Sequence, residues 1–272
     1  MKIINLIEDT QGTEELHAEH GLSIYIETSR HKILVDTGAS EKTWENAERL
    51  GVRPEEIDTV FLSHGHYDHS GGILSFSKIN PNARICLHPS AGFAYYNLRD
   101  NREKYIGIDA EILQLPQCIF LQAGYRVDEE ISVFGDVTGR RKWPGSNLTL
   151  KRKEGNRFVQ DSFDHEQYIV VEEQGRKVLL SGCAHNGILN ILDRYGELYG
   201  GRPDIVISGF HMMKKEPYDE KDIAVIRDIG EELSGMDTLF YTGHCTGMQA
   251  FHIMKESMGD QLQYMHAGDR IL

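Results

Sequence analysis

Several features are scarce or missing in this 272-residue chain, and each absence excludes a class of protein. No run of about 18 apolar residues occurs, so we expect no membrane-spanning helix and no membrane partner. Only four cysteines are present, without a CxxC pair, which excludes a disulfide framework. Basic residues number 29 against 42 acidic ones, and the resulting net charge of −13 argues against nucleic acid as a partner.

Targeting signals and several catalytic motifs are missing as well. The apolar run 3–7 is too short for a signal peptide and is interrupted by Glu8 and Asp9, so we expect a cytoplasmic protein with reduced thiols. The chain has no GxxxxGK[ST] loop, no GxGxxG after a strand, no GxSxG elbow and no HExxH helix. Nucleotide-binding and serine-hydrolase interpretations therefore lack support.

What the chain does have is a globular composition and 13 histidines. Hydrophobic residues make up 40%, enough for a sizeable core in a chain of this length. Segments typical of strands and of helices alternate throughout, which predicts a layered α/β or α+β fold in a single domain spanning 1–272. The stretch 138–164 has little apolar periodicity and several glycines, so it is predicted to be a long loop or lid.

One short segment concentrates potential metal ligands. Directly after the buried strand predicted at 57–62, three imidazoles and a carboxylate occur within six positions, at His64, His66, Asp68 and His69. An extended backbone presents His64 and His66 on one side, whereas Asp68 and His69 follow one turn later and can face a second point. Imidazole and carboxylate are preferred ligands of zinc and other first-row divalent ions. The spacing therefore predicts two adjacent metal ions.

The pattern His-x-His-x-Asp-His resembles the signature of the metallo-β-lactamase superfamily. Further segments in the same order resemble one subgroup, which is named for an archaeal pterin enzyme, 7,8-dihydropterin-6-methyl-4-(β-D-ribofuranosyl)aminobenzene 5′-phosphate synthase. These segments are 18–27, 33–38, 62–72, 181–188, 208–211 and 242–247. The resemblance implies an αββα four-layer sandwich of the α+β class, with the metals at one edge between two sheets.

The resemblance also implies roles for individual residues. His64 and His66 match ligands of the first metal, and Asp68 and His69 match ligands of the second. His244 matches the last histidine ligand of the second metal. Asp36, in Val-Asp-Thr-Gly, matches an aspartate that orients a ligand histidine, although it could equally be a turn-forming residue. Two divalent ions are expected as cofactors, zinc first, with manganese or iron as alternatives.

The sequence departs from the superfamily where a Gly-Asp pair usually supplies a bridging carboxylate. Here the pair is Gly-Cys, with Cys183 in the second position, and His185 follows two residues later. We predict that His185 is the third ligand of the first metal. Cys183 is either a thiolate ligand or a small buried residue at the end of a strand, and His165 or Glu166 could line the site instead. The missing aspartate weakens the expectation of ordinary hydrolysis.

Two other groups of residues have both a functional and a structural interpretation. His20 and His211 lie beside predicted strand ends and either contact substrate at the pocket rim or make structural hydrogen bonds. The basic triplets 140–142 and 151–153, with Trp143 between them, could form a lid over a phosphorylated planar ligand. Alternatively, they are a solvated basic loop or contact an acidic neighbouring subunit in a homodimer.

These features together predict a metal-dependent enzyme, a hydrolase or a transferase, that acts on a small anionic substrate. Asp68 and His185 are the predicted catalytic residues, with Asp68 as both ligand and proton acceptor. The alternatives are a diiron redox module and a sensor that binds a metal or a phosphorylated metabolite without catalysis.

Overall fold

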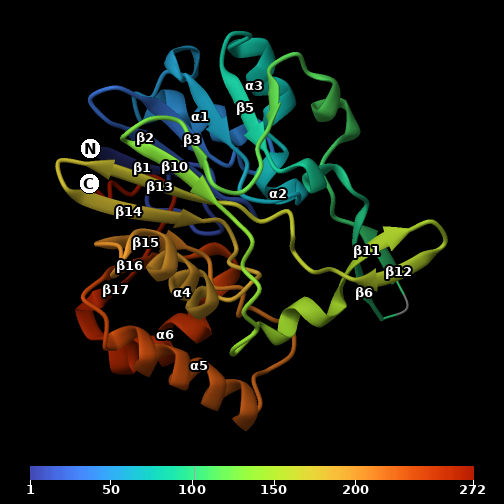
Figure 1. Ribbon diagram of the computed structural model, residues 1–272, viewed down its shortest axis with the longest axis vertical. Coiled ribbons are helices and arrows are strands. Elements are labelled where there is room, and N and C mark those ends of the chain that lie inside the picture. Colours follow the sequence, from blue (N-terminus) through green and yellow to red (C-terminus); the bar gives the residue numbers. More distant parts are fainter. Residues whose placement is uncertain (101) are drawn as a thin grey trace.

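A computed structural model describes residues 1–100 and 102–272, and the strands in this part of the chain form three sheets (Figure 1). The first sheet has the order β1-β2-β3-β4-β5-β8, the second β17-β16-β15-β14-β13-β10-β9, and the third β12-β11-β6-β7. The strands are β1 Lys2–Ile7, β2 Ser23–Glu27, β3 Lys32–Val35, β4 Thr59–Phe61, β5 Arg84–Leu87, β6 Tyr95–Arg99, β7 Arg102–Tyr105, β8 Cys118–Phe120, β9 Tyr125–Arg126, β10 Ile131–Phe134, β11 Leu150–Glu154, β12 Arg157–Gln160, β13 Tyr168–Glu173, β14 Arg176–Ser181, β15 Ile205–Ser208, β16 Leu239–Thr242 and β17 Leu262–Tyr264. The α-helices are α1 Lys42–Arg49, α2 Tyr67–Ser70, α3 Ile73–Ile79, α4 Ile188–Tyr199, α5 Glu220–Ser234 and α6 Met248–Met258.

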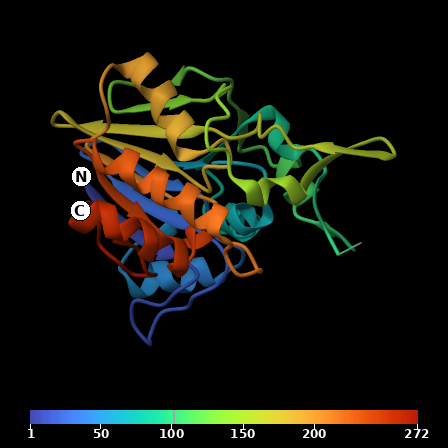
Figure 2. The ribbon, with the colours of Figure 1, turned by 90° about the horizontal axis from the view of Figure 1, so that it is seen from below.

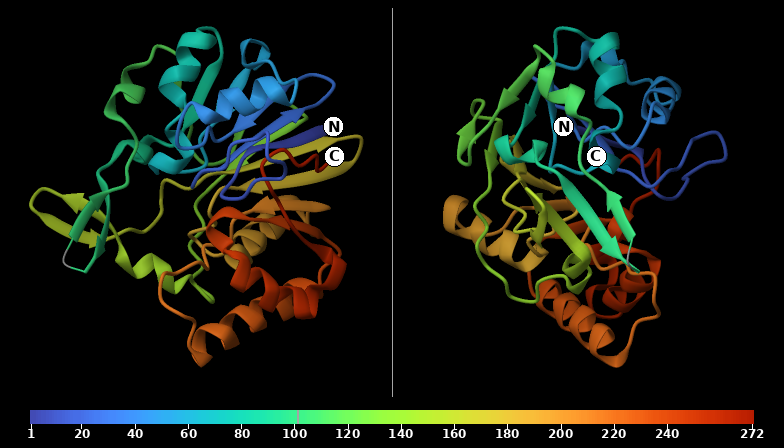
Figure 3. Two further views of the ribbon diagram at one scale, coloured as in Figure 1. Left: turned by 180° about the vertical axis from the view of Figure 1, so that it is seen from behind. Right: turned by 90° about the vertical axis from the view of Figure 1, so that its right-hand side faces the viewer.

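Alternating side chains of the central strands pack into different cores. Ile24 and Ile26 of β2 share a buried cluster with Ile169 of β13, so the first two sheets face each other. Tyr25 points the opposite way and packs with apolar residues of α1 and α3, whereas Tyr168 packs with α4, α5 and α6. Helices therefore cover both outer faces (Figures 1 and 3). The predicted αββα four-layer sandwich is confirmed.

The strand directions explain why the predicted site residues converge. In the first sheet β3 and β4 are parallel, and in the second β14, β15 and β16 are parallel. Parallel strands end at the same edge of a sheet, and functional residues collect in the loops that follow. Asp36 follows β3, His64 follows β4, Cys183 follows β14, His211 follows β15 and His244 follows β16.

The sequence suggested that 138–164 is a long loop or lid, but part of this segment forms regular secondary structure. A short 3₁₀ helix covers Gly145–Thr149, and β11 and β12 form an antiparallel hairpin that pairs with β6. The hairpin projects from the body of the molecule (Figure 2). Of the residues in β11 only Leu150 is buried, so an alternating apolar pattern is not needed there and could not reveal the strand.

Both basic triplets have acidic or polar partners close by. Arg141 pairs with Asp193 of α4 at 3.0 Å and also with Glu232 of α5, and Lys142 lies 2.6 Å from Glu232. In the second triplet, Lys151 donates to Gln160 across the hairpin. These contacts tie the start of the segment to α4 and α5, and a lid function for 138–164 stays a prediction.

Within the described residues, every helix is too short or too polar to cross a bilayer.

A close backbone contact holds α2, which carries two of the predicted ligands, against the loop after β3. Gly71 caps α2, and a Cβ added there would lie 2.1 Å from the Ala39 carbonyl oxygen. We expect Gly71→Ala to lower the free energy of unfolding by about 1–3 kcal/mol because the backbone must move. Urea denaturation measures this, and Gly145→Ala is the matched control, since nothing lies within 4 Å of a Cβ there. Equal stability of the two variants would contradict the proposed contact.

Candidate metal centre

Four buried histidines at the edge between the sheets share one arrangement. Each has its Nδ1 atom within hydrogen-bond distance of an oxygen, which accepts the Nδ1 proton and leaves Nε2 as a free lone pair. The pairs are His64 with Ser63 Oγ at 2.8 Å, His69 with Asp36 Oδ2 at 2.7 Å, His185 with Asn147 Oδ1 at 2.9 Å and His244 with Asp9 Oδ1 at 2.7 Å. The Nε2 atoms can thereby act as metal ligands, although in His69 and His244 an ion would displace a proton, because despite burial the neighbouring carboxylates raise the pKa of both rings.

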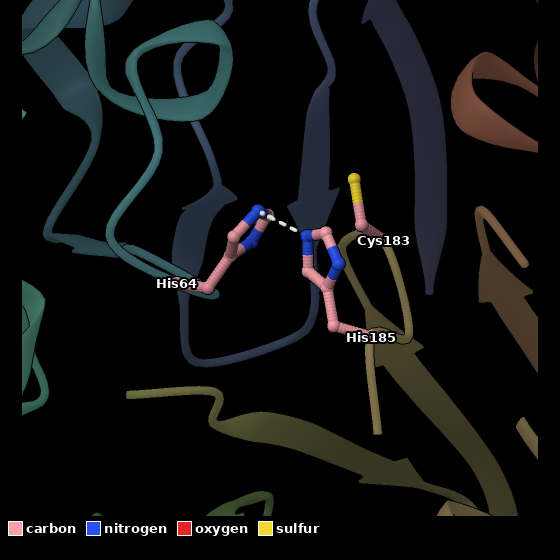
Figure 4. A group of neighbouring side chains, drawn as sticks. All are labelled: His64, Cys183 and His185. Atoms are coloured by element: carbon pink, nitrogen blue, oxygen red, sulfur yellow. Dashed lines mark hydrogen bonds between the residues drawn. The ribbon is translucent and has the colours of Figure 1, made fainter. Parts of the chain in front are cut away.

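His64, Cys183 and His185 form one set of ligand atoms, all within 4.8 Å of one another (Figure 4). The Nε2 atoms of His64 and His185 face each other at 3.3 Å. With both Nδ1 protons directed elsewhere, two lone pairs meet at this contact. Two nitrogens about 2.0–2.1 Å from a tetrahedral zinc ion lie about 3.3–3.4 Å apart, so the spacing suits a shared cation.

His66 lies beside this first set. Its ring centroid is 4.6 Å from that of His64 and 4.9 Å from that of His185. The His66 Nε2 atom is buried and has no hydrogen-bond partner in the described part of the chain. A buried imidazole nitrogen without a partner is costly, and a metal ligand role would satisfy it.

His69, Cys183 and His244 form a second set within the same 4.8 Å limit. His69 Nε2 lies 3.2 Å from Cys183 Sγ. The Oδ2 atom of Asp68 lies 3.4 Å from His244 Nε2 and 3.7 Å from His69 Nε2. His244 Nε2 is another buried nitrogen that lacks a hydrogen-bond partner among residues 1–100 and 102–272.

Cys183 belongs to both sets, and its sulfur occupies the space between them. The sequence analysis left open whether this residue is a ligand or only a small buried residue. The structure places it just after β14, buried, with its sulfur 3.2 Å from His69 Nε2.

Burial sets the protonation of the first set. It lowers the pKa of His64 and His185 well below the ordinary value and that of His66 to about 3, with neighbouring imidazoles adding to the effect. Neutral imidazoles are the form that binds metal. Burial alone would raise the pKa of Asp68, but His69 and His244 outweigh it and hold that pKa well below its usual range. Asp68 is therefore a carboxylate.

The backbone is strained where these loops leave the strands. Asp36, Ala184, His211 and His244 have φ values of 64°, 52°, 49° and 47°, in the left-handed region that residues other than glycine seldom adopt. Each lies just beyond the carboxyl end of β3, β14, β15 or β16. Strain of this kind persists where surrounding contacts enforce it, often at functional sites.

The remaining predicted residues fall into two groups. His165 is buried, but its Nδ1 accepts from the Gly65 N–H at 2.9 Å and its Nε2 lies 3.2 Å from Asp161 Oδ2, so neither nitrogen is free. Glu166 accepts backbone N–H groups of His185 and its neighbour, at 2.6 and 2.9 Å, and thereby holds the His185 loop. His165 thus contacts the backbone beside His64, and Glu166 positions the loop that carries His185.

His20 and His211 both lie beside the ligand sets, and their contact with substrate stays a prediction. His20 is 47% exposed, stacks on His244 with ring centroids 4.7 Å apart, and places Nε2 3.5 Å from Asp68 Oδ2. The His211 ring lies 4.0 Å from the His185 ring.

Several residues that complete the site were missed by sequence reasoning. Asp9 and Asn147 orient His244 and His185, and Phe163 stacks on His185 with ring centroids 4.4 Å apart. Asp9 and Asn147 lie 235 and 38 residues from their partners, so no local spacing could reveal them. Ser63, which orients His64, differs from Asp9 and Asn147 because it directly precedes its histidine in the sequence.

The chain belongs to the metallo-β-lactamase superfamily, whose family model matches residues 18–208. It is 28% identical to 7,8-dihydropterin-6-methyl-4-(β-D-ribofuranosyl)-aminobenzene-5′-phosphate synthase of Methanocaldococcus jannaschii, over 98% of this chain and 95% of that protein. The crystal structure of a metal-dependent hydrolase of the β-lactamase superfamily matches with a TM-score of 0.83 and 29% identity, covering 100% of this chain and 98% of that one. The resemblance stated from the motifs is confirmed.

The oxygen that orients His185 provides a test of the site. Asn147→Ala removes the acceptor of the His185 Nδ1 proton, and loss of such an outer partner typically costs 10–100-fold in metal affinity. We expect a fall of about that size, measured by equilibrium dialysis against Zn²⁺. Asn147→Asp keeps an acceptor oxygen and should lose less, and the exposed Asn82→Ala is the control. Equal affinity in Asn147→Ala and the control would show that His185 needs no orienting partner.

Proposed function

We propose that this protein is a metal-dependent enzyme with a dinuclear centre, most suited to zinc. The observation that carries the proposal is the 3.3 Å contact between His64 Nε2 and His185 Nε2, with both Nδ1 protons directed elsewhere. A cation between them would satisfy two facing lone pairs. Burial disfavours a proton in that place, because it lowers the pKa of both imidazoles.

The ligands divide into two sets in this proposal. His64, His66 and His185 hold the first ion, and Asp68, His69 and His244 hold the second. Cys183 would offer its sulfur to either ion, at the position where the superfamily usually has a carboxylate. Nitrogen, sulfur and carboxylate donors together suit zinc, whereas magnesium and calcium prefer oxygen alone. Manganese or iron are the alternatives for the same set.

Two bound divalent ions would polarise a substrate oxygen and lower the pKa of a bound water toward 7. The chain's own residues do the rest. Asp68 is an ionised carboxylate in contact with His244 and His69, and it would accept a proton only briefly, because these neighbours hold its pKa low. His20, half-exposed and 3.5 Å from Asp68 Oδ2, can pass the proton on to solvent. Phe163 and Asn147 keep the His185 ring in place.

A cavity of about 620 Å³ adjoins the centre and supports a small substrate. His211, which contacts the His185 ring, lies in its wall together with Trp143, Met212 and Tyr218. Lys142 also lines it, and an anionic, phosphorylated group would compete with Glu232 for this cation. Hydrolysis and group transfer are both supported, since one relative is named a hydrolase and another a synthase acting in dihydropterin chemistry.

Removing one ligand from each set tests the centre. We expect His66→Ala and Asp68→Ala each to lose at least one equivalent of bound metal, because each exposes an ion to water on one side. Elemental analysis after dialysis measures the metal, and hydrolysis of a chromogenic phosphate ester, expected to fall at least a hundredfold, measures the reaction. His252→Ala, exposed on α6, is the control.

Full metal content and full turnover in both variants would contradict a dinuclear enzyme. The visible spectrum separates the remaining alternatives. A colourless protein with zinc supports hydrolysis or transfer, whereas an iron chromophore would support a diiron redox module. Metal binding with no turnover of any ester would favour a sensor.

A further inference from the structure

A third group of ligand atoms lies next to the centre, and two of its three members, His211 and Cys245, hold no ion in the proposed function. The side chains of Cys183, His211 and Cys245 place their sulfur and nitrogen atoms within 4.8 Å of one another. They come from the loops after β14, β15 and β16, so three neighbouring parallel strands each contribute one of them. Both cysteines are buried and free.

The contacts of Cys245 direct its sulfur into this group. Its Sγ atom accepts from the backbone N–H of His211 at 3.3 Å, and its thiol donates to the Cys183 carbonyl oxygen at 3.6 Å. Gly209 makes room for it, because a Cβ at that position would lie 2.5 Å from the sulfur. The absence of a side chain at position 209 therefore lets the Cys245 sulfur lie close to Cys183.

The His211 side chain also has an unsatisfied atom. Its Nδ1 is buried without a hydrogen-bond partner in the described residues, although the ring sits among other polar groups. His211 itself has a left-handed φ of 49°, which directs the residue toward the site at a cost in backbone energy.

A disulfide explains the group less well than a metal does. Strands β14 and β16 are not neighbours, because β15 lies between them. The two sulfurs thus approach over Gly209 from backbones one strand apart, and a direct bond needs close backbones. A metal ion can join sulfurs that are farther apart than in a disulfide, since two thiolates about 2.3 Å from a tetrahedral zinc lie well over 3 Å from each other.

We infer that Cys183, His211 and Cys245 form a third metal-binding set, which takes a thiophilic divalent ion such as Zn²⁺ or Cd²⁺. This third set adds His211 and Cys245, which belong to neither of the other two sets. The inference rests on the proposed function, because the third set shares Cys183 with the dinuclear centre. The His211 and His185 rings, 4.0 Å apart, connect the third set to the first. Cys183 is then the sulfur on which all three sets meet.

Cadmium binding tests this set. The full-length protein and the variants Cys245→Ser and His211→Ala are dialysed against Cd²⁺, and bound metal is counted by elemental analysis. Thiolate-to-cadmium absorbance is recorded in parallel. We expect three ions in the unchanged protein and two in each variant, with weaker thiolate absorbance in Cys245→Ser. Cys118→Ser, whose half-buried thiol donates to the Ile112 carbonyl far from the site, should keep three.

The counts separate this set from the proposed dinuclear centre. One ion in the unchanged protein that is lost in both variants would support the third set and contradict the centre. Equal counts in the unchanged protein and both variants would overturn the third set. Two ions falling to one would also overturn it, since Cys245 and His211 would then serve the centre itself. Thermal unfolding shows that each variant is folded, and His211→Ala decides the test if Cys245→Ser is not.

Discussion

The buried carboxylate of Asp36 holds both halves of the histidine motif in place. Its Oδ2 atom accepts from His69 Nδ1 and from the Ser63 hydroxyl, and its Oδ1 atom accepts from the Ser63 N–H, each at 2.7 Å. Ser63 can then accept from His64 Nδ1 at 2.8 Å. One carboxylate thus sets the tautomer of a histidine in each ligand set and leaves both Nε2 atoms free. If Asp36 were only a turn residue, this network would have no reason to exist.

Cys183 is where this chain differs from the common pattern of its superfamily. A sulfur in place of a bridging carboxylate makes the proposed centre softer and favours thiophilic ions over those that prefer oxygen. The residues around the sulfur therefore affect metal binding at the centre, because a thiolate can contact ions from several sides. Cys245 and His211 are the neighbours in question, and a thiol at position 183 suits a soft sulfur and nitrogen environment better than a carboxylate would.

The apolar runs of the buried strands and the spacing of the histidine motif could be read from the sequence, whereas the four-layer sandwich was implied by the resemblance to the superfamily. Strands buried on both faces must be apolar throughout, as at Ile24–Ile26 and Tyr168–Val171, and such runs are visible without a structure. The small third sheet was invisible, because β11 buries only Leu150 and its other side chains are polar or half-exposed. Local patterns reveal burial, and where little is buried they reveal little.

By itself the sequence determined which residues stand together in the His64–His69 motif, since their spacing along one strand end and one helical turn is local. It also suggested His244 and Asp36 through their resemblance to a family pattern, and His185 at the point where the sequence departs from that pattern. Only the tertiary structure decided which oxygens orient them, because Asn147 and Asp9 reach their histidines across 38 and 235 residues. The same holds for Cys183 and Cys245, which meet because parallel strands end at one edge of the sheet. Such contacts depend on how strands are ordered in space, and residue spacing carries no record of that order.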